Sequence, residues 1–192
     1  MGRFKPLLPF GSKTVIESCV DTYLAAGIQT IIVVLHHQGD AIKSQLQKVP
    51  VQFAFNPDPK SEMSVSIECG VRVIPEAAQA VFITPADYPA VPPTVVSALV
   101  QPWSQGQAKL LVPEYGNRGG HPVLIDISFR DELLDLDSKG GLRGFLQDHR
   151  RDVLRVPVDS PFIARDLDTW DDYQTLHHDV FGFFPPAGRK EI

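Results

Sequence analysis

An aspartate placed directly after an apolar strand is the residue of this sequence best suited to metal chemistry. Residues 80–84 read as a strand, and they are followed by Pro85-Ala86-Asp87-Tyr88-Pro89. In open α/β sheets, ligands lie beyond the carboxyl ends of the strands. Mg²⁺ prefers carboxylate and phosphate oxygens and usually keeps several waters. Asp87 is therefore a candidate Mg²⁺ ligand, although an aspartate close to a proline can also simply start a turn.

Three further stretches carry polar residues at places where a ligand could bind. Ser61-Glu62-Met63-Ser64-Val65-Ser66-Ile67-Glu68-Cys69-Gly70 opens a predicted helix, whose first N–H groups have no partner within the helix and can hold a phosphate or a base carbonyl. A capping role for Ser61 or Ser64 is the simpler interpretation of its serines. The other two stretches are Met1-Gly2-Arg3-Phe4-Lys5-Pro6-Leu7-Leu8-Pro9 and, much later, Arg165-Asp166-Leu167-Asp168-Thr169-Trp170.

Together with Arg118-Gly119-Gly120-His121-Pro122, these stretches resemble one family in content and order. The chain is similar to the MobA-like NTP transferases, and among them it looks most like molybdenum cofactor cytidylyltransferases. The first stretch resembles the second half of the family signature, and the last resembles a late Asp-x-Asp-Thr-Pro motif in which Trp170 replaces the proline. The resemblance covers nearly the whole chain.

The resemblance implies a role for each of these positions. Lys5 would neutralise charge at the α-phosphate, Asp87 and Asp166 would share Mg²⁺, and Asp168 and Asp172 would cap or charge the start of the last helix. Lys5 could instead be a solvated lysine, and His121 a structural histidine. The implied assignments are: catalytic, Lys5 and Asp87; nucleotide-binding, Gly2, Lys5, Ser66 and Gly70; metal, Asp87 and Asp166; acceptor-binding, His121 and Arg118.

The implied reaction transfers CMP from CTP to a phosphorylated pterin, the molybdopterin cofactor, with release of pyrophosphate. GTP as donor is an alternative. A cytidylyltransferase of isoprenoid precursor synthesis fits less well, because that branch prefers a lysine where this sequence has Asp166. An alternative from another class is a non-catalytic nucleotide- or cofactor-binding protein that assists maturation of a molybdoenzyme partner.

The family signature is cut short at the start of this chain. The sequence begins at the methionine that follows the family's first strand, its Gly-rich loop and the signature arginine. Without that strand, its two neighbours should have unpaired edges, at a cost of about 1–3 kcal/mol for each buried group. Losing one phosphate-binding N–H donor typically slows catalysis by about 10²–10³. A start codon assigned too late and a loss of activity both fit this pattern.

Alternating helical and extended segments predict an α/β fold, with an open, mostly parallel sheet between two helical layers. Thr14 and Glu17 have the spacing of a capping box, and Gly27 should end the first helix. We expect one domain over residues 1–180 and a Pro-rich apolar tail over 181–192. Predicted helices span 14–27, 40–47, 64–74, 93–103, 128–136, 142–149 and 170–178, and predicted strands span 30–35, 51–55, 80–84, 109–112, 122–127, 153–158 and 162–164.

Bulk properties exclude several classes of function. The 192 residues carry a net charge of −5, which argues against binding to nucleic acid or to an anionic membrane. The longest apolar run is far shorter than the roughly 20 residues of a transmembrane helix. Cys19 and Cys69 lie in separate predicted helices without metal-ligand spacing. We expect them to be buried reduced thiols in a cytoplasmic protein.

Overall fold

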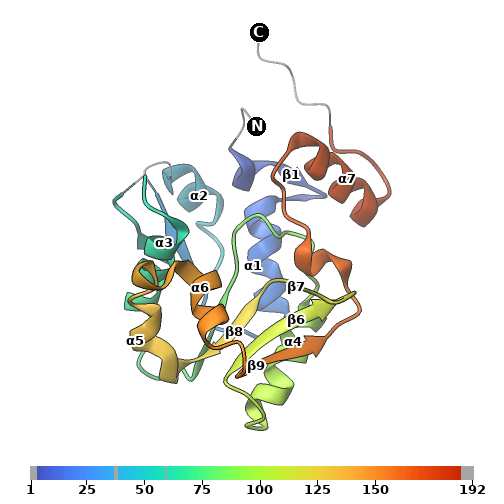
Figure 1. Ribbon diagram of the computed structural model, residues 1–192. Helices are drawn as coiled ribbons and strands as arrows, with labels where there is room; N and C mark the ends of the chain where they lie inside the picture. The colour runs from blue at the N-terminus through green and yellow to red at the C-terminus, as the bar shows by residue number, and fades with distance from the viewer. Residues whose placement is uncertain (1–3, 37–38, 59, 187–192) are drawn as a thin grey trace.

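Helices cover both faces of a central sheet in the computed structural model, which describes residues 4–36, 39–58 and 60–186 (Figure 1). The strands are β1 (Pro9–Phe10), β2 (Lys13–Thr14), β3 (Ile32–Leu35), β4 (Gln52–Phe55), β5 (Ala80–Ile83), β6 (Leu110–Tyr115), β7 (Arg118–Gly119), β8 (Val123–Asp126) and β9 (Val153–Pro157). The α-helices are α1 (Val15–Ala25), α2 (Gly39–Gln45), α3 (Met63–Arg72), α4 (Pro93–Ser104), α5 (Arg130–Leu133), α6 (Gly141–Asp148) and α7 (Trp170–Phe181). Short 3₁₀ turns are η1 (Lys5–Leu7), η2 (Ile127–Phe129), η3 (Asp137–Lys139) and η4 (Pro161–Ala164).

The strands form one larger sheet and a separate parallel pair. β8 lies between β5 and β6 and is antiparallel to both, so β5 and β6 run in the same direction. β9 continues the sheet parallel to β6, and β3 pairs in parallel with β4. Apart from β8 and the short hairpin strand β7, the larger sheet is thus parallel in direction. The predicted fold class is confirmed.

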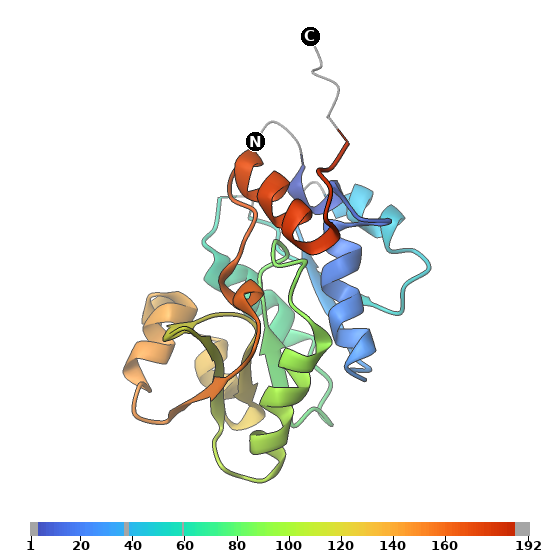
Figure 2. The same cartoon turned by 90° about the vertical axis from the view of Figure 1, so that its right-hand side faces the viewer.

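Alternation along β6 and β8 places apolar side chains on both faces of the sheet. Leu110, Val112, Val123 and Ile125 pack with α3, α5 and α6 on one face. Leu111 and Leu124 pack with Leu99 and Trp103 of α4 on the other. The second view separates these layers, with α1 and α4 on one side of the sheet and α5 and α6 on the other (Figure 2). This is the predicted three-layer αβα arrangement.

Local sequence signals set the first helix as expected. The Thr14 hydroxyl accepts a hydrogen bond from the backbone N–H of Glu17, and the Glu17 carboxylate accepts one from the backbone N–H of Thr14, which completes the capping box. Gly27 follows the helix with φ +84°, a conformation that glycine adopts without steric cost. Cys19 and Cys69 are free thiols, the first buried and the second half-buried.

One predicted strand is wrong. Residues 162–164 belong to the 3₁₀ turn η4 rather than to a strand. Pro161 occupies its first turn, and the hydroxyl of Ser160 accepts a hydrogen bond from the backbone N–H of Phe162. A proline followed by a serine-capped turn favours helical over extended backbone. The hairpins β1–β2 and β6–β7 were not predicted from the sequence.

The described part of the tail packs on the body of the domain. α7 continues to Phe181, one residue beyond the expected domain boundary, and the Phe181 ring lies 4.9 Å from that of Phe10. The buried side chain of His177 joins the two ends, because its Nε2 accepts a hydrogen bond from Gly11 N–H and its Nδ1 contacts the Phe183 carbonyl. No helix in the described ranges is long and apolar enough to cross a membrane.

The edges of β3 and β5 that a missing strand could cover are unpaired. Within the described residues, β3 pairs only with β4, and β5 pairs only with β8; β4, β7 and β9 likewise have one partner each. All four residues of β5, Ala80 to Ile83, are only half-buried, which is unusual for a strand in the middle of a three-layer domain. The expectation that a missing strand leaves these two edges unpaired stays a prediction.

Leu99→Ala tests the layer that α4 forms on the sheet. Leu99 is fully buried against Leu111 and Leu124, so its truncation should leave a cavity and lower the free energy of unfolding by about 2–5 kcal/mol. Urea denaturation followed by circular dichroism measures this change. Val73→Ala, at an exposed position after α3, should change it by less than about 0.5 kcal/mol. Equal effects of the two substitutions would contradict the packing.

Candidate functional site

An acidic cluster forms where the loop after β5 meets the segment that follows η4. Asp87 comes from the first, and Asp166 and Asp168 from the second. Leu167 between them is fully buried against Leu8 and Tyr173, among others, and anchors this segment. Leu167 is buried, whereas Asp166 is half-buried and Asp168 is exposed, so the two carboxylates stay outside the apolar cluster that holds Leu167.

Lys5 brings a positive charge close to this cluster. Its Nζ lies 3.2 Å from Asp168 Oδ1, and η1 is held close by Leu8, which packs in the same apolar cluster as Leu167. The Lys5–Asp168 pair is largely exposed, so by itself it contributes little to stability. The position of Lys5 matters more than this ion pair, because the Lys5 ammonium also lowers the pKa of Asp87.

The Asp87 carboxylate is the most perturbed acid of the cluster. Burial raises its pKa above the usual range, repulsion by Asp166 and Asp168 adds to this, and Lys5 partly offsets it. Its Oδ1 atom is buried, and no described residue donates a hydrogen bond to it. A buried carboxylate oxygen without a donor is costly unless a cation binds there.

These residues fit a divalent metal ion bound together with a substrate. In the described ranges, no group of three or more His, Cys, Asp or Glu side chains could hold a metal without further ligands. Mg²⁺ is typically held by one or two carboxylates, substrate phosphates and waters, so Asp87 and Asp166 would be the carboxylates available to a divalent ion bound here together with a phosphate. Asp172 instead completes a capping box with Thr169 at the start of α7, as expected for that position.

Tyr88 couples the acidic cluster to the neighbouring pocket. Burial raises the pKa of Tyr88 to about 12, and the nearby carboxylates and a hydrogen bond with Asp166 add to the shift. Its ring packs edge-on against the imidazole of His121, with ring centroids 4.9 Å apart. The phenol therefore lies between the carboxylates on one side and His121 on the other.

His121 is held in place by a close approach of two backbone segments. Its N–H donates to the Ile163 carbonyl at 2.7 Å, and a Cβ on the preceding residue, Gly120, would lie 2.1 Å from that same oxygen. Burial lowers the pKa of His121, and contacts with the Ile83 carbonyl and Asp166 partly offset this. Arg118, in contrast, is exposed at the β6–β7 hairpin and is not among the residues that line the pocket.

Ser66 belongs to a polar network at the ends of β3 and β4. Its hydroxyl lies 3.0 Å from both Asn56 Nδ2 and His36 Nε2, and Asn56 also donates to Ser61 at 2.8 Å. His36 and Asn56 directly follow their strands, and their position at strand ends was the only sequence signal that could have singled them out. Gly70 lies one turn further along α3, where an added Cβ would come within 3.1 Å of Val34.

The expected caps of α3 are wrong. Glu62 occupies the N-cap position, and no side chain caps the helix there. The Ser61 hydroxyl donates to the Asp58 carbonyl and accepts from Asn56, and the Ser64 hydroxyl donates to Asp137 at 3.1 Å, so neither hydroxyl caps the helix. The first N–H groups of α3 are thus left without a side-chain cap. Gly2, also expected at the nucleotide, lies outside the described residues.

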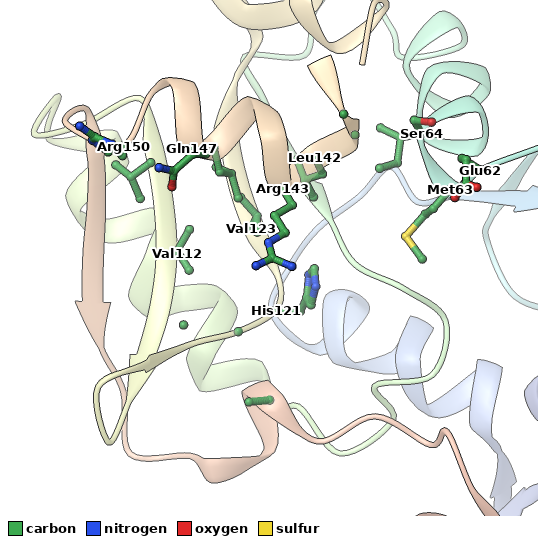
Figure 3. A pocket seen from close by; sticks show the side chains of 18 of the residues that line it. Glu62, Met63, Ser64, Val112, His121, Val123, Leu142, Arg143, Gln147 and Arg150 are labelled. Carbon is green, nitrogen blue, oxygen red and sulfur yellow. The ribbon is translucent and has the colours of Figure 1, made fainter. Parts of the chain in front are cut away.

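A cavity of about 890 Å³ lies beyond Tyr88 and His121 (Figure 3). Its walls are the start of α3 and one face of α6, and Val112, Val123 and Val153 of the sheet form its floor. Gly119, Gly120, His121 and Ala164 close the end that faces the acidic cluster. A ligand in this cavity would therefore lie next to a substrate held by Asp87 and Asp166.

Comparison with known proteins identifies the family of this chain. Residues 1–153 match the MobA-like NTP transferase domain. The chain belongs to the MobA-like NTP transferase family. Nicotine blue oxidoreductase of Paenarthrobacter nicotinovorans is 24% identical over 173 residues, which span 86% of this chain and 83% of that protein.

Solved structures share the fold of this MobA-like chain. Rv0371c of Mycobacterium tuberculosis superposes with a TM-score of 0.83 at 23% identity, over 93% of this chain and 91% of that one. A second structure of that protein is a complex with manganese, with a TM-score of 0.77 at 24% identity over 92% and 93% of the two chains. Molybdopterin-guanine dinucleotide biosynthesis protein A of Archaeoglobus fulgidus has a TM-score of 0.61 at 17% identity, over 89% and 87%.

Asp87→Asn tests the electrostatics of the MobA-like site. Because the pKa of Asp87 is raised in the folded state, its ionised carboxylate lowers stability at every pH above the unfolded value of about 3.9. We expect the variant to be more stable than the wild type at pH 7 without divalent metal, with the gain vanishing below about pH 4. Urea denaturation between pH 3.5 and 7 measures the difference.

Metal and a matched carboxylate serve as controls for that measurement. Mn²⁺ or Mg²⁺ should stabilise the wild type more than Asp87→Asn, since binding to the folded state adds to its stability. Asp159→Asn, at an exposed position, should leave stability unchanged. A variant less stable than the wild type at pH 7 would contradict the raised pKa.

Gly120→Ala tests the backbone contact that positions His121. The added methyl would collide with the Ile163 carbonyl, and backbone cannot move aside as a flexible side chain can. We expect a loss of about 1–3 kcal/mol in the free energy of unfolding, measured by urea denaturation. Gly119→Ala should cost less, because its Cβ would meet the side chains of Arg155 and Val112 at 3.0 and 3.1 Å. An equal loss in both variants would refute this reasoning.

Proposed function

We propose that this protein transfers CMP from CTP to a phosphorylated pterin of the molybdopterin type, with the help of Mg²⁺ or a similar divalent ion. One observation carries the proposal. Lys5 and Asp166 come from two other parts of the chain, and the charges of both act on the Asp87 carboxylate. Membership of the MobA-like family supports nucleotidyl transfer as the reaction class.

The reaction requires neutralisation of phosphate charge rather than acid-base catalysis. An oxygen of the acceptor phosphate attacks the α-phosphorus of CTP, a new P–O bond forms, and the bond to the β-phosphate oxygen breaks to release pyrophosphate. An ionised acceptor phosphate has no proton to give up, so no general base is required. A divalent ion on Asp87 and Asp166 would offset charge that builds on the α-phosphate. Lys5 lies on the same side and would neutralise the remaining phosphate charge.

The start of α3 is the proposed place for the base and ribose. Its N–H groups lack a side-chain cap, and Ser66 is oriented by Asn56 and His36. Uncapped N–H groups favour a base carbonyl or an anion. Asn56 is almost fully buried, so this network holds the Ser66 hydroxyl in a fixed direction.

Two alternatives keep the same site. GTP could replace CTP, and the relative of Archaeoglobus fulgidus bears the name of a molybdopterin-guanine dinucleotide protein. A non-catalytic protein that carries nucleotide or cofactor to a molybdoenzyme would bind without turnover. The name of nicotine blue oxidoreductase illustrates that family membership alone does not fix the reaction, so the proposal depends on the three charged residues.

Binding and turnover are tested separately. We expect saturable calorimetric binding of CTP, stronger than that of GTP, in the presence of Mg²⁺ or Mn²⁺. With molybdopterin added, pyrophosphate release should follow. Lys5→Ala and Asp87→Ala should each reduce the rate by at least about 10²-fold, because each removes charge stabilisation in the transition state. Lys48→Ala, at an exposed lysine in the loop after α2, should behave as wild type.

Each result decides between the alternatives. Preference for GTP would assign the guanylyl reaction, and nucleotide binding without turnover would favour the carrier. Wild-type rates in both Lys5→Ala and Asp87→Ala would refute the roles of these residues.

A further inference from the structure

The cavity beyond His121 contains more positive than negative side chains, and their partners differ. Arg143, Arg150 and Arg155 line it, together with Glu62 and Asp137. Arg155 is bound to Glu114 at 3.0 Å, and Asp137 accepts a hydrogen bond from Ser64. Arg143 and Arg150 are exposed, and no ion pair or side-chain hydrogen bond joins either of them to a described residue. Of these two cations without a protein counter-ion, Arg143 is the one beside His121 (Figure 3).

Arg143 lies on the face of α6 that turns toward the cavity. Gln147 shares this face at a spacing of four residues, and Arg150, in the turn after the helix, also lines the cavity, while Phe145 faces the core. Figure 3 shows the Arg143 guanidinium directed toward the imidazole of His121, and Arg150 at the far end of the helix.

The carboxylates of Asp87, Asp166 and Asp168 repel an acceptor phosphate, and the positive charge of Arg143 can offset this repulsion. Three carboxylates repel a phosphorylated acceptor, and Lys5 lies on the side proposed for the nucleotide. An acceptor phosphate approaching from the cavity needs positive charge on its own side. Arginine provides it with several N–H donors in one plane, a geometry that matches phosphate.

His121 supplies a second polar contact at the same point. Its Nδ1 lies 3.5 Å from the Ile83 carbonyl, and Nε2 contacts no hydrogen-bonding group among the described residues. Nε2 is the ring nitrogen that remains available to a ligand in the cavity. Arg143 and His121 then face the same volume, next to Tyr88 and the proposed metal ligands.

We infer that Arg143 binds the attacking phosphate of the acceptor and holds it against His121. The body of the acceptor then lies over the apolar surface of Ile67, Leu142 and Leu146, with its far end toward Arg150. This defines the substrate class: an elongated molecule with a phosphate at one end and an apolar or flat body. The inference rests on the proposed function, since only nucleotidyl transfer makes this phosphate the nucleophile.

Anion binding and nucleotide binding are measured independently to test this. The probes are 6-carboxypterin, followed by its own fluorescence, and inorganic phosphate as its competitor, while CTP with Mg²⁺ is titrated by calorimetry. Arg143→Ala should weaken 6-carboxypterin binding by about 10-fold or more, because it removes a charge-assisted hydrogen bond. CTP affinity should change by less than about twofold. Arg143→Lys should restore part of the loss, because it keeps the charge without the planar fork.

Arg151→Ala is the matched control, because Arg151 is exposed on a neighbouring turn and does not line this cavity. It should bind both ligands as the wild type does. With molybdopterin as substrate, Arg143→Ala should raise the KM for the acceptor at least as much as it weakens the probe, and leave the KM for CTP unchanged. Thermal unfolding of each variant verifies that the fold is retained.

The outcomes separate the inference from the proposed function. Equal probe binding by the wild type and Arg143→Ala, or no wild-type binding of either probe up to about 10 mM, would overturn the role of Arg143. Loss of CTP binding in Arg143→Ala would also overturn it, because the residue would then serve the nucleotide. Arg143-dependent probe binding in a wild type that binds neither CTP nor GTP would leave the anion site standing and refute the reaction.

Discussion

Burial of both faces of the central sheet is the constraint on which the remaining structure depends. Strands β6 and β8 are covered by α4 on one face and by α3, α5 and α6 on the other, so their side chains are apolar on both. Polar side chains are costly in such layers unless they are hydrogen-bonded. They therefore gather in the loops beyond the strand ends, where Asp87 follows β5 and Asn56 follows β4.

The same constraint explains why the site is assembled from distant segments. Leu8 and Leu167 are both buried beside α7, and this apolar contact brings η1 and the Asp166–Asp168 segment together. Lys5 and the two aspartates flank these anchors in sequence, so packing of leucines sets the position of the charges. Charge repulsion among the carboxylates is then tolerated because hydrophobic burial, which is non-directional, holds the backbone.

Tyr88 and His121 divide the site into two compartments with opposite electrostatic character. On one side lie carboxylates suited to a metal ion and a triphosphate, and on the other lies a cavity with arginines and an apolar floor. Gly120 makes this division possible, because only glycine allows the His121 loop to approach η4 so closely. A reaction that joins two anionic substrates needs such separate binding surfaces meeting at one point.

The sequence by itself determined the fold class and most element positions, because apolar periodicity and helix caps act locally, and its motifs in their order indicated the family. It also marked Asp87, Lys5, Ser66, Gly70, His121 and Asp166 as site residues, whose roles stay predictions. Only the tertiary structure decided that Ser64 binds Asp137 instead of capping α3, that residues 162–164 form a turn, and that Arg118 lies apart from the cavity. It also revealed Arg143, which has no motif of its own. These outcomes depend on contacts between residues far apart in the chain, which no local pattern encodes.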